Sequence, residues 1–149
     1  MKIRTDYVTN SSSSSFILGF NTEEEIDDIL NQLPYYWSEE VKENIVSDIK
    51  NEVISKESAV QYYMDRMWFC DGFHGKSYWN LTKNEKDSAE FQQYIQDQKD
   101  KLATEVATKL KNYEIISIVT YADDDRLGSE LEHDIMPCLD SVIERMSNH

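Results

Sequence analysis

The stretch YEIISIVTY, Tyr113 to Tyr121, carries the clearest secondary-structure signal in this chain of 149 residues. β-Branched and aromatic residues dominate it, and such residues favour the pleated backbone of a strand. Its nearly continuous apolar character indicates a strand that is largely buried. A second apolar run, FILGF from Phe16 to Phe20, is a candidate partner strand. We expect both segments to lie in one sheet, because a strand of this length needs pairing and apolar cover.

Three short helices are expected between these two strands, because apolar residues recur there at helical spacing. Asn21 or Thr22 caps the first helix, whose opening acids complement the helix dipole, and Pro34 ends it. Ser38 and Ser55 mark the starts of the second and third helices. The residues expected to point inward are Ile26, Ile29, Leu30 and Leu33, then Val41, Ile45, Ile49 and Val53, then Val60, Tyr63, Met64, Met67 and Trp68.

A longer helix is predicted from Thr82 to about Lys111 and is expected to pack on the sheet. The tail from Ile135 to Met146 is ambiguous, because VIERM suits either a strand that closes the sheet or a helix that continues past Pro137. A length of 149 residues is the usual size of one domain. We therefore predict a single acidic α+β domain over residues 1–149, with several helices packed on a small sheet.

The formal net charge is −14, and it is distributed unevenly. The segment 21–65 holds twelve acids against three lysines, and the segment 122–144 holds eight acids against one arginine. A surface of this kind repels nucleic acid and anionic membranes and attracts cations or basic protein surfaces. We therefore expect a partner protein with a basic surface, and neither direct nucleic-acid binding nor membrane binding.

The cysteine content favours a reducing compartment. Cys70 and Cys138 form no CxxC pair and are too few for a disulfide framework. No apolar stretch approaches the roughly 18 residues that a membrane helix needs, and the opening residues lack the pattern of a secretory signal. We expect a cytoplasmic protein, and the oligomeric state stays open.

Five consecutive serines, Ser11 to Ser15, separate a candidate short strand, IRTDYV, from FILGF. One interpretation is a solvated turn, a segment for modification or a flexible leader over residues 1–15. The alternative is a ligand loop in which Asn10, Ser11, Ser12 and Ser13 hold a phosphate or another anion through hydroxyls and backbone amides. We favour the solvated interpretation, since neither GxxxxGK[ST] nor GxGxxG is present.

The opening segment from Lys2 to Phe16, KIRTDYVTNSSSSSF, resembles the N-terminal signature of a family of small uncharacterised proteins of Gram-positive bacteria, mainly clostridia, and their phages. GSELEH at Gly128 to His133 and SNH at Ser147 to His149 are similar to the endings of some members. The resemblance implies a bacterial or phage setting. It transfers no catalytic residues, because the family brings no established activity.

The segment YADDDRLGSELEHD, directly after the long strand, gathers acids and one histidine. Acids at the end of a buried strand are well placed to bind Mg²⁺, Mn²⁺ or Ca²⁺, which prefer oxygen ligands. The spacing matches neither an EF-hand loop nor a zincin. A solvated turn is favoured, and no cofactor is expected; the alternative is a divalent-metal site made of Asp123, Asp125, Glu130 and His133.

Cys70 and His74, in WFCDGFHG, are a second candidate for metal binding. Cys138 and either His133 or His149 would complete a four-ligand zinc site if the fold brought them together. A cysteine beside aromatic residues is more often a small buried hydrophobe, so packing is favoured. A Cys/His nucleophile pair is disfavoured, because nothing identifies a third, orienting group.

Aromatic residues cluster at two places along the chain. They are Tyr35, Tyr36 and Trp37 after Pro34, and Phe73, Tyr78 and Trp79 in the irregular stretch before the long helix. Most are expected to pack in the core or within loops. Any that are exposed together would form a contact patch typical of protein interfaces.

Two functions of different classes follow. The first is a non-enzymatic interaction or inhibitor protein, phage-encoded and directed against bacterial defence, that presents carboxylate-rich helices to a basic partner surface. Its expected contact residues are Glu23, Asp27, Glu39, Glu40 and Glu43, some of which lie four apart on a helix and about 6 Å from each other, close to the phosphate spacing of a nucleic-acid strand. The second is a metal-dependent enzyme that uses the segment from Asp123 to His133. We favour the first, with an ordinary solvated acidic surface as its alternative.

Overall fold

The strand predicted from YEIISIVTY is β3, Ile115–Ala122, and it pairs antiparallel with β1, Ser13–Phe20, as predicted. The computed structural model describes residues 13–122 and 125–147. Within these residues the sheet has the order β2-β3-β1-β4, with β2 at Val53–Ile54 and β4 at Val142–Ser147. Every pairing in this sheet is antiparallel. The fold is a single α+β domain, which confirms the predicted class.

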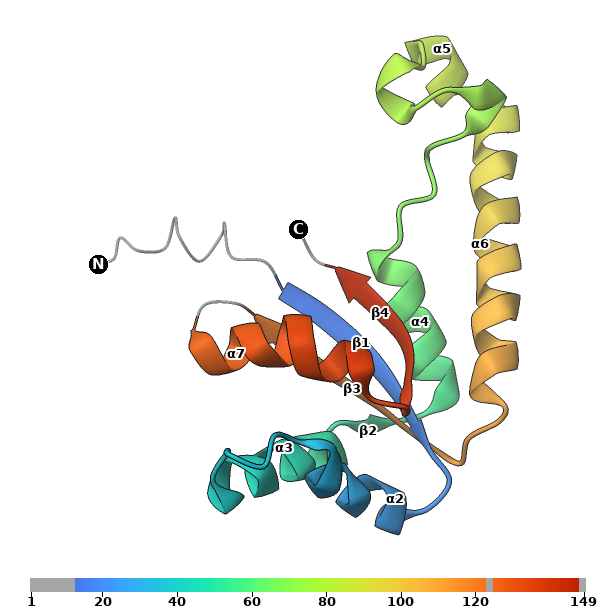
Figure 1. Ribbon diagram of the computed structural model, residues 1–149. Helices are drawn as coiled ribbons and strands as arrows, with labels where there is room; N and C mark the ends of the chain where they lie inside the picture. The colour runs from blue at the N-terminus through green and yellow to red at the C-terminus, as the bar shows by residue number, and fades with distance from the viewer. Residues whose placement is uncertain (1–12, 123–124, 148–149) are drawn as a thin grey trace.

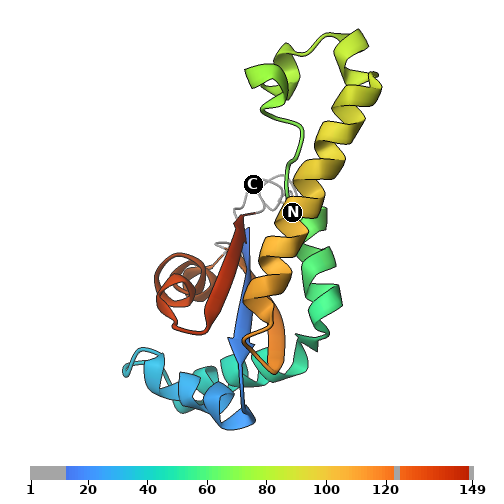
Figure 2. The same cartoon turned by 90° about the vertical axis from the view of Figure 1, so that its right-hand side faces the viewer.

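β1 is central, and helices cover both faces of the sheet (Figure 2). Phe16, Leu18 and Phe20 point into one hydrophobic cluster, whereas Ile17 points into another. Strands buried on both faces carry nearly continuous apolar runs rather than an alternating pattern. This double burial explains the unbroken sequence FILGF.

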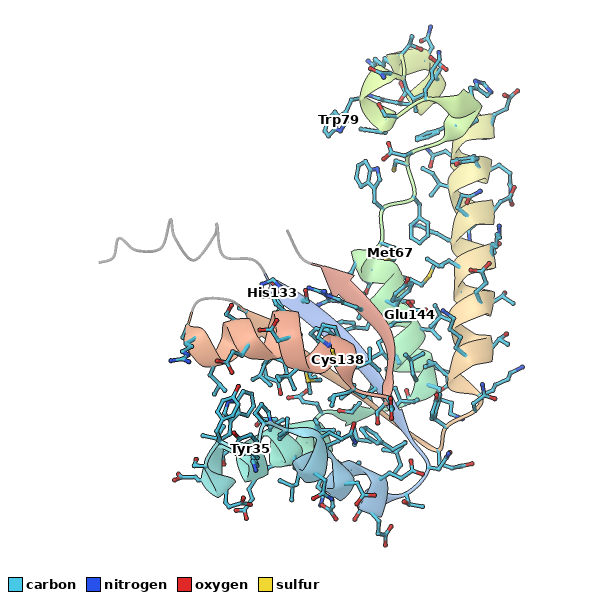
Figure 3. The ribbon with its side chains drawn as sticks, in the orientation of Figure 1. Tyr35, Met67, Trp79, His133, Cys138 and Glu144 are labelled. Atoms are coloured by element: carbon cyan, nitrogen blue, oxygen red, sulfur yellow. The ribbon has the colours of Figure 1, made fainter. Side chains whose placement is uncertain are left out.

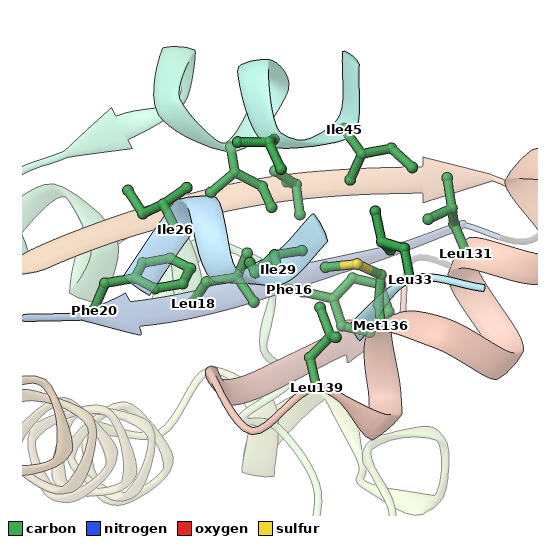
Figure 4. Packing of buried hydrophobic residues seen from close by; sticks show 13 residues of the cluster. Phe16, Leu18, Phe20, Ile26, Ile29, Leu33, Ile45, Leu131, Met136 and Leu139 are labelled. Carbon is green, nitrogen blue, oxygen red and sulfur yellow. The ribbon is translucent and has the colours of Figure 1, made fainter. Parts of the chain in front are cut away.

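The first face of the sheet is covered by helices from both halves of the chain. They are α2 (Glu23–Asp27), the 3₁₀ turn η1 (Asp28–Gln32) and α3 (Glu39–Asn51), together with α7 (Arg126–Glu130), the π-helical turn η4 (Leu131–Ile135) and the 3₁₀ turn η5 (Met136–Cys138). Ile29, Ile45 and Met136 meet Phe16 and Leu18 in this cluster (Figure 4). The N- and C-terminal parts of the chain therefore share one core.

The second face is covered by α4 (Lys56–Arg66) and by the C-terminal half of α6 (Ala89–Leu110). Val106 and Leu110 of α6 pack with Ile17 and Ile118 of the sheet. The N-terminal half of α6 extends away from the sheet and carries a small lobe with η2 (Phe73–Gly75), η3 (Tyr78–Asn80) and α5 (Lys83–Lys86) (Figure 1). Phe73, Leu81 and Phe91 form a separate cluster within this lobe.

The predicted helix starts are confirmed by their caps. The side chains of Thr22, Ser38 and Ser55 each accept a hydrogen bond from a backbone N–H in the first turn of α2, α3 and α4. The single helix predicted from Thr82 is wrong in one respect. Thr82 caps the short α5 through a capping box, and Ser88 caps α6 anew. The chain therefore breaks its helix between Lys86 and Ala89, because a second capping side chain competes there.

Three of the residues predicted to point inward from helices, Val53, Met67 and Trp68, lie outside the helices and are exposed. α3 ends at Asn51, so Val53 lies in the short β2 and is 46% exposed. Met67 and Trp68 follow the end of α4 and are 37% and 56% exposed. In each case the helical spacing of apolar residues continues in the sequence beyond the last residue of the helix, although the backbone is no longer helical there.

Two further expectations concern the ends of the chain. VIERM forms β4 beside β1, which resolves the ambiguous tail in favour of a strand. The flexible leader predicted over residues 1–15 is wrong for Ser13, Ser14 and Ser15, which form the first part of β1. Pairing with β3 and β4 on both sides holds these serines in place. The candidate strand IRTDYV lies outside the described residues.

Candidate functional site

The serine run enters the core as a strand whose side chains alternate between the two faces. Ser14 and Ser15 are both fully buried. The Ser14 hydroxyl donates a hydrogen bond to Glu132 at 2.9 Å on one face. On the other face, Ser15 Oγ lies 2.9 Å from the Tyr62 hydroxyl and 2.7 Å from Thr120 Oγ1. These hydroxyls satisfy polar groups inside the protein.

Only one residue of the ligand loop predicted at the serines lies in the described part of the chain. Ser13 belongs to β1, where it is half-buried. Asn10, Ser11 and Ser12 lie outside the described residues. The structure therefore assigns a strand to Ser13, and an anion-binding loop over Asn10 to Ser12 stays a prediction.

Glu132 is the buried charged residue of this region, and sequence reasoning missed it. Its side chain is 0% exposed and lies in the π-helical turn η4, a kind of distortion often found at functional sites. Arg145 of β4 lies 3.9 Å from Glu132, donates hydrogen bonds to Ser14, and has its guanidinium carbon over the Phe16 ring, 5.6 Å from the ring centroid. His133 is 3.6 Å from Glu132. The cluster joins β1, η4 and β4 through charged hydrogen bonds.

The residues predicted to bind a divalent metal have local structural partners. Asp125 caps α7 by accepting a hydrogen bond from the backbone N–H of Gly128 at 2.6 Å. Glu130 is paired with Arg126 at 3.3 Å. Asp123 lies outside the described residues. In residues 13–122 and 125–147, no three His, Cys, Asp or Glu side chains come together as a metal site would require.

The zinc ligands considered above are dispersed in the described part of the chain. Cys70 is half-buried and packs against the aromatic cluster of the α5 lobe. His74 stacks on Phe73 in the lobe, whereas Cys138 is exposed in η5, in the body of the molecule and away from the lobe (Figure 3). Both cysteines are free thiols. His149 lies outside the described residues.

The acidic residues predicted to bind a partner are all exposed, and they are Glu23, Asp27, Glu39, Glu40 and Glu43. They lie on α2 and α3, at the end of the molecule opposite the α5 lobe (Figure 1). Asp27 is bridged to Lys50 at 2.7 Å and Glu39 to Lys42 at 3.6 Å. Hydrogen bonding to Asp27 raises the pKa of Lys50.

The aromatic residues are divided between the core and two exposed sites. Trp37 packs against the first core cluster, and Phe73 is buried in the lobe. Tyr35 is 90% exposed near α3, and Trp79 is 79% exposed in the lobe at the other end of the molecule (Figure 3). In the lobe, Tyr78 makes edge contacts with both Trp68 and Trp79. Exposed aromatic residues therefore lie at both ends of the domain.

Two adjoining hollows lie along the outer edge of β3. Their volumes are about 480 and 390 Å³, and both are lined by Asp48, Thr120 and Tyr121. The first extends to Glu52, Ile54 and Tyr62, and the second to Val41, Asn44, Asp125, Leu127 and Leu131. The charged side chains among the described lining residues are all acidic. We call this feature the β3-edge groove.

The Tyr121 hydroxyl is buried in this groove wall. Among the described residues it contacts no hydrogen-bond partner. Burial, together with the nearby Asp48 carboxylate, raises the pKa of Tyr121 well above its ordinary value. A buried hydroxyl without a partner is costly, because its removal from water is not compensated by a hydrogen bond.

Comparisons of the chain with protein-family models, with curated proteins and with solved structures found no match. Within the described residues, no helix combines the length and the apolar character that crossing a membrane would require.

Proposed function

We propose that this protein is a cytoplasmic, non-enzymatic interaction module that presents the carboxylates of α2 and α3 to a basic surface of a partner protein. The observation that carries the proposal is the separation of roles on α3. Ile45, Val46 and Ile49 are buried in the core, while Glu39, Glu40 and Glu43 are exposed at the other side of the helix. These exposed carboxylates therefore take no part in packing the core.

Few cations in this part of the molecule are available to neutralise these acids. The segment 21–65 carries twelve acids and three lysines. Two of the lysines are engaged, Lys42 with Glu39 and Lys50 with Asp27. Glu40 and Glu43 form no ion pair with a described residue. An uncompensated field of this kind steers a basic partner during association.

The spacing of the carboxylates favours a partner that normally binds nucleic acid. Glu39 and Glu43 lie four residues apart in the same helix, so their side chains are neighbours about 6 Å apart. That distance is close to the phosphate spacing along a nucleic-acid strand. Inhibition would then arise because the carboxylates occupy a surface that otherwise binds phosphates. The phage or bacterial setting implied by the N-terminal signature agrees with such a role.

The test is a charge reversal with a matched control. Glu39, Glu40 and Glu43 are changed together to lysine, and in the control Asp97, Asp100 and Glu105 of α6 are changed to lysine, which alters the net charge equally. With a partner captured from the host, the first variant should slow association at least about tenfold relative to the control. Association of the unmodified protein should slow between low and physiological salt, as charges beyond about 8 Å become screened.

A second variant changes the same three residues to glutamine, which removes the negative charge without adding a positive one. This variant is less disruptive to α3, since two of the three acids lie in its first turn and complement its dipole. Circular dichroism checks that each variant keeps its helix content. An oligonucleotide should compete with the protein for the partner. The proposal would be wrong if partner binding were unaffected by salt, by the oligonucleotide and by all three substitutions. The acidic face would then serve only to keep the protein in solution.

A further inference from the structure

The edge of β3 is left open by the strand beside it. In the described part of the chain, β2 pairs with β3 at Ser117 and Ile116 alone. One further backbone contact follows, where the Ile118 N–H donates to the Glu52 carbonyl at 3.3 Å. Beyond Ile118 no described strand lies on this side of β3.

The unpaired backbone groups on this edge can be identified from the strand alternation. In an antiparallel strand, alternate residues direct their N–H and C=O to the same edge. Since the Ile118 N–H points toward β2, the N–H and C=O of Thr120 point to the same open edge. At the far end, α7 approaches so closely that a Cβ on Gly128 would lie 2.0 Å from the Ala122 carbonyl oxygen. The open edge is therefore a window between Glu52 and Gly128.

The window lies in the β3-edge groove, between helices that cover opposite faces of the sheet. Val119 and Tyr121 belong to the face that α3 covers, and Ile118 to the face that α4 covers. A strand added here would direct alternate side chains toward Asp48 on one side and toward Tyr62 on the other. The groove thus offers both backbone pairing and side-chain contacts, the two elements of strand addition.

The charge of the groove specifies the occupant. Glu40, Asn44, Asp48 and Glu52 are spaced four apart and form one row that runs from the acidic part of α3 to the window. Asp125 lies at the other end of the groove. Acidic side chains with an apolar floor suit an extended segment that bears lysine or arginine between apolar residues.

We propose that the β3-edge groove binds an extended, basic segment of a partner protein by adding it as a strand next to Thr120. This inference rests on the proposed function, since it gives the basic partner a defined binding mode. It adds a claim that charge alone does not make, namely that backbone hydrogen bonds to Thr120 contribute to binding.

The test uses a synthetic probe. A blocked, fluorescein-labelled heptapeptide of alternating lysine and valine is titrated with the full chain, and anisotropy reports binding. Its counterpart has the same charge, but its five central amides are N-methylated and cannot donate hydrogen bonds. We expect the methylated peptide to bind at least about tenfold more weakly, because strand addition loses its hydrogen bonds. Asp48→Asn with Glu52→Gln should weaken the first peptide more than Asp97→Asn with Asp100→Asn.

Hydrogen exchange supplies the decisive readout. Saturating unmethylated peptide should slow exchange of the Thr120 amide at least about tenfold. Thr120→Pro removes the N–H at an edge position where proline is tolerated, and Thr120→Val controls for the lost hydroxyl; the proline variant alone should lose peptide affinity. Equal binding of both peptides, an unprotected Thr120 amide, or no binding at millimolar peptide would overturn the proposal. A partner that responds to reversal of Glu39, Glu40 and Glu43 and leaves Thr120 unprotected would retain the proposed function and reject the groove.

Discussion

The Ser14 hydroxyl donates a hydrogen bond to the buried Glu132 carboxylate at 2.9 Å, across 118 positions of sequence. This contact joins the start of the central strand to the π-helical turn near the end of the chain. Arg145 approaches both residues from β4. The polar cluster is thus a structural junction of three elements that are distant in sequence.

Removing the hydroxyl of Ser14 should destabilise the protein. Ser14→Ala leaves a buried carboxylate with one donor fewer, so we expect the free energy of unfolding to fall by about 1–3 kcal/mol. Urea unfolding followed by circular dichroism measures the change. Ser13→Ala, at a half-buried neighbour in the same strand, should change it by less than about 0.5 kcal/mol. Equal effects at both serines would contradict the role of the Glu132 contact.

Replacing Tyr121 by phenylalanine should leave the stability unchanged or raise it by about 1 kcal/mol. The Tyr121 hydroxyl is buried without a described partner, so its removal relieves a desolvation cost. Thermal and urea unfolding of Tyr121→Phe measure the effect. Tyr62→Phe is the matched control and should be destabilising, because Tyr62 shares a hydrogen bond with Ser15. A loss above about 1 kcal/mol in Tyr121→Phe would reveal an unrecognised partner.

The α5 lobe should weaken in acid through Glu85. The backbone N–H of Thr82, followed by Lys76, holds the pKa of Glu85 below its ordinary value of 4.5. A lowered pKa contributes stability that is present above the ordinary value and is lost as the pH falls through the folded value. An NMR titration of the Glu85 carboxyl should show the shift. Lys76→Gln should raise the pKa only in part, because the Thr82 amide, the main cause, remains.

Divalent cations should change the melting temperature little. Asp125 and Glu130 already serve as a helix cap and an ion-pair partner, so their oxygens are engaged. Millimolar Mg²⁺, Mn²⁺ or Ca²⁺ in a thermal melt tests this expectation. A rise of several degrees that Asp123→Ala abolishes would favour the metal-dependent enzyme instead.

The cap itself makes a separate prediction. Asp125→Ala should cost about 1 kcal/mol with or without metal, because the Gly128 N–H loses its acceptor. Asp125→Asn keeps an accepting oxygen and should retain most of that stability. Urea unfolding in EDTA and in Mg²⁺ compares the two variants. A loss seen in Mg²⁺ alone would identify Asp125 as a metal ligand.

The local elements of this fold follow from short stretches of sequence. The apolar runs of β1 and β3, and the caps at Thr22, Ser38 and Ser55, are properties of a few neighbouring residues, and they were predicted correctly. The break before α6 is not predicted from the sequence, because a serine such as Ser88 is also common on the exposed surface of a continuous helix. Only the structure shows that the Ser88 hydroxyl accepts a hydrogen bond from the Phe91 N–H and so begins a new helix. Local signals predict that an element exists better than they predict where it ends.

The identity of the buried polar residues and of the open sheet edge, in contrast, depends on how distant segments pack together. Nothing in SSSSSF distinguishes the buried Ser14 and Ser15 from solvated serines, because their partners, Glu132 and Tyr62, lie far away along the chain. The β3-edge groove likewise depends on where β2 stops and where α7 meets Ala122. Burial and pairing are sums over contacts between distant segments, so they become defined only when the chain has folded.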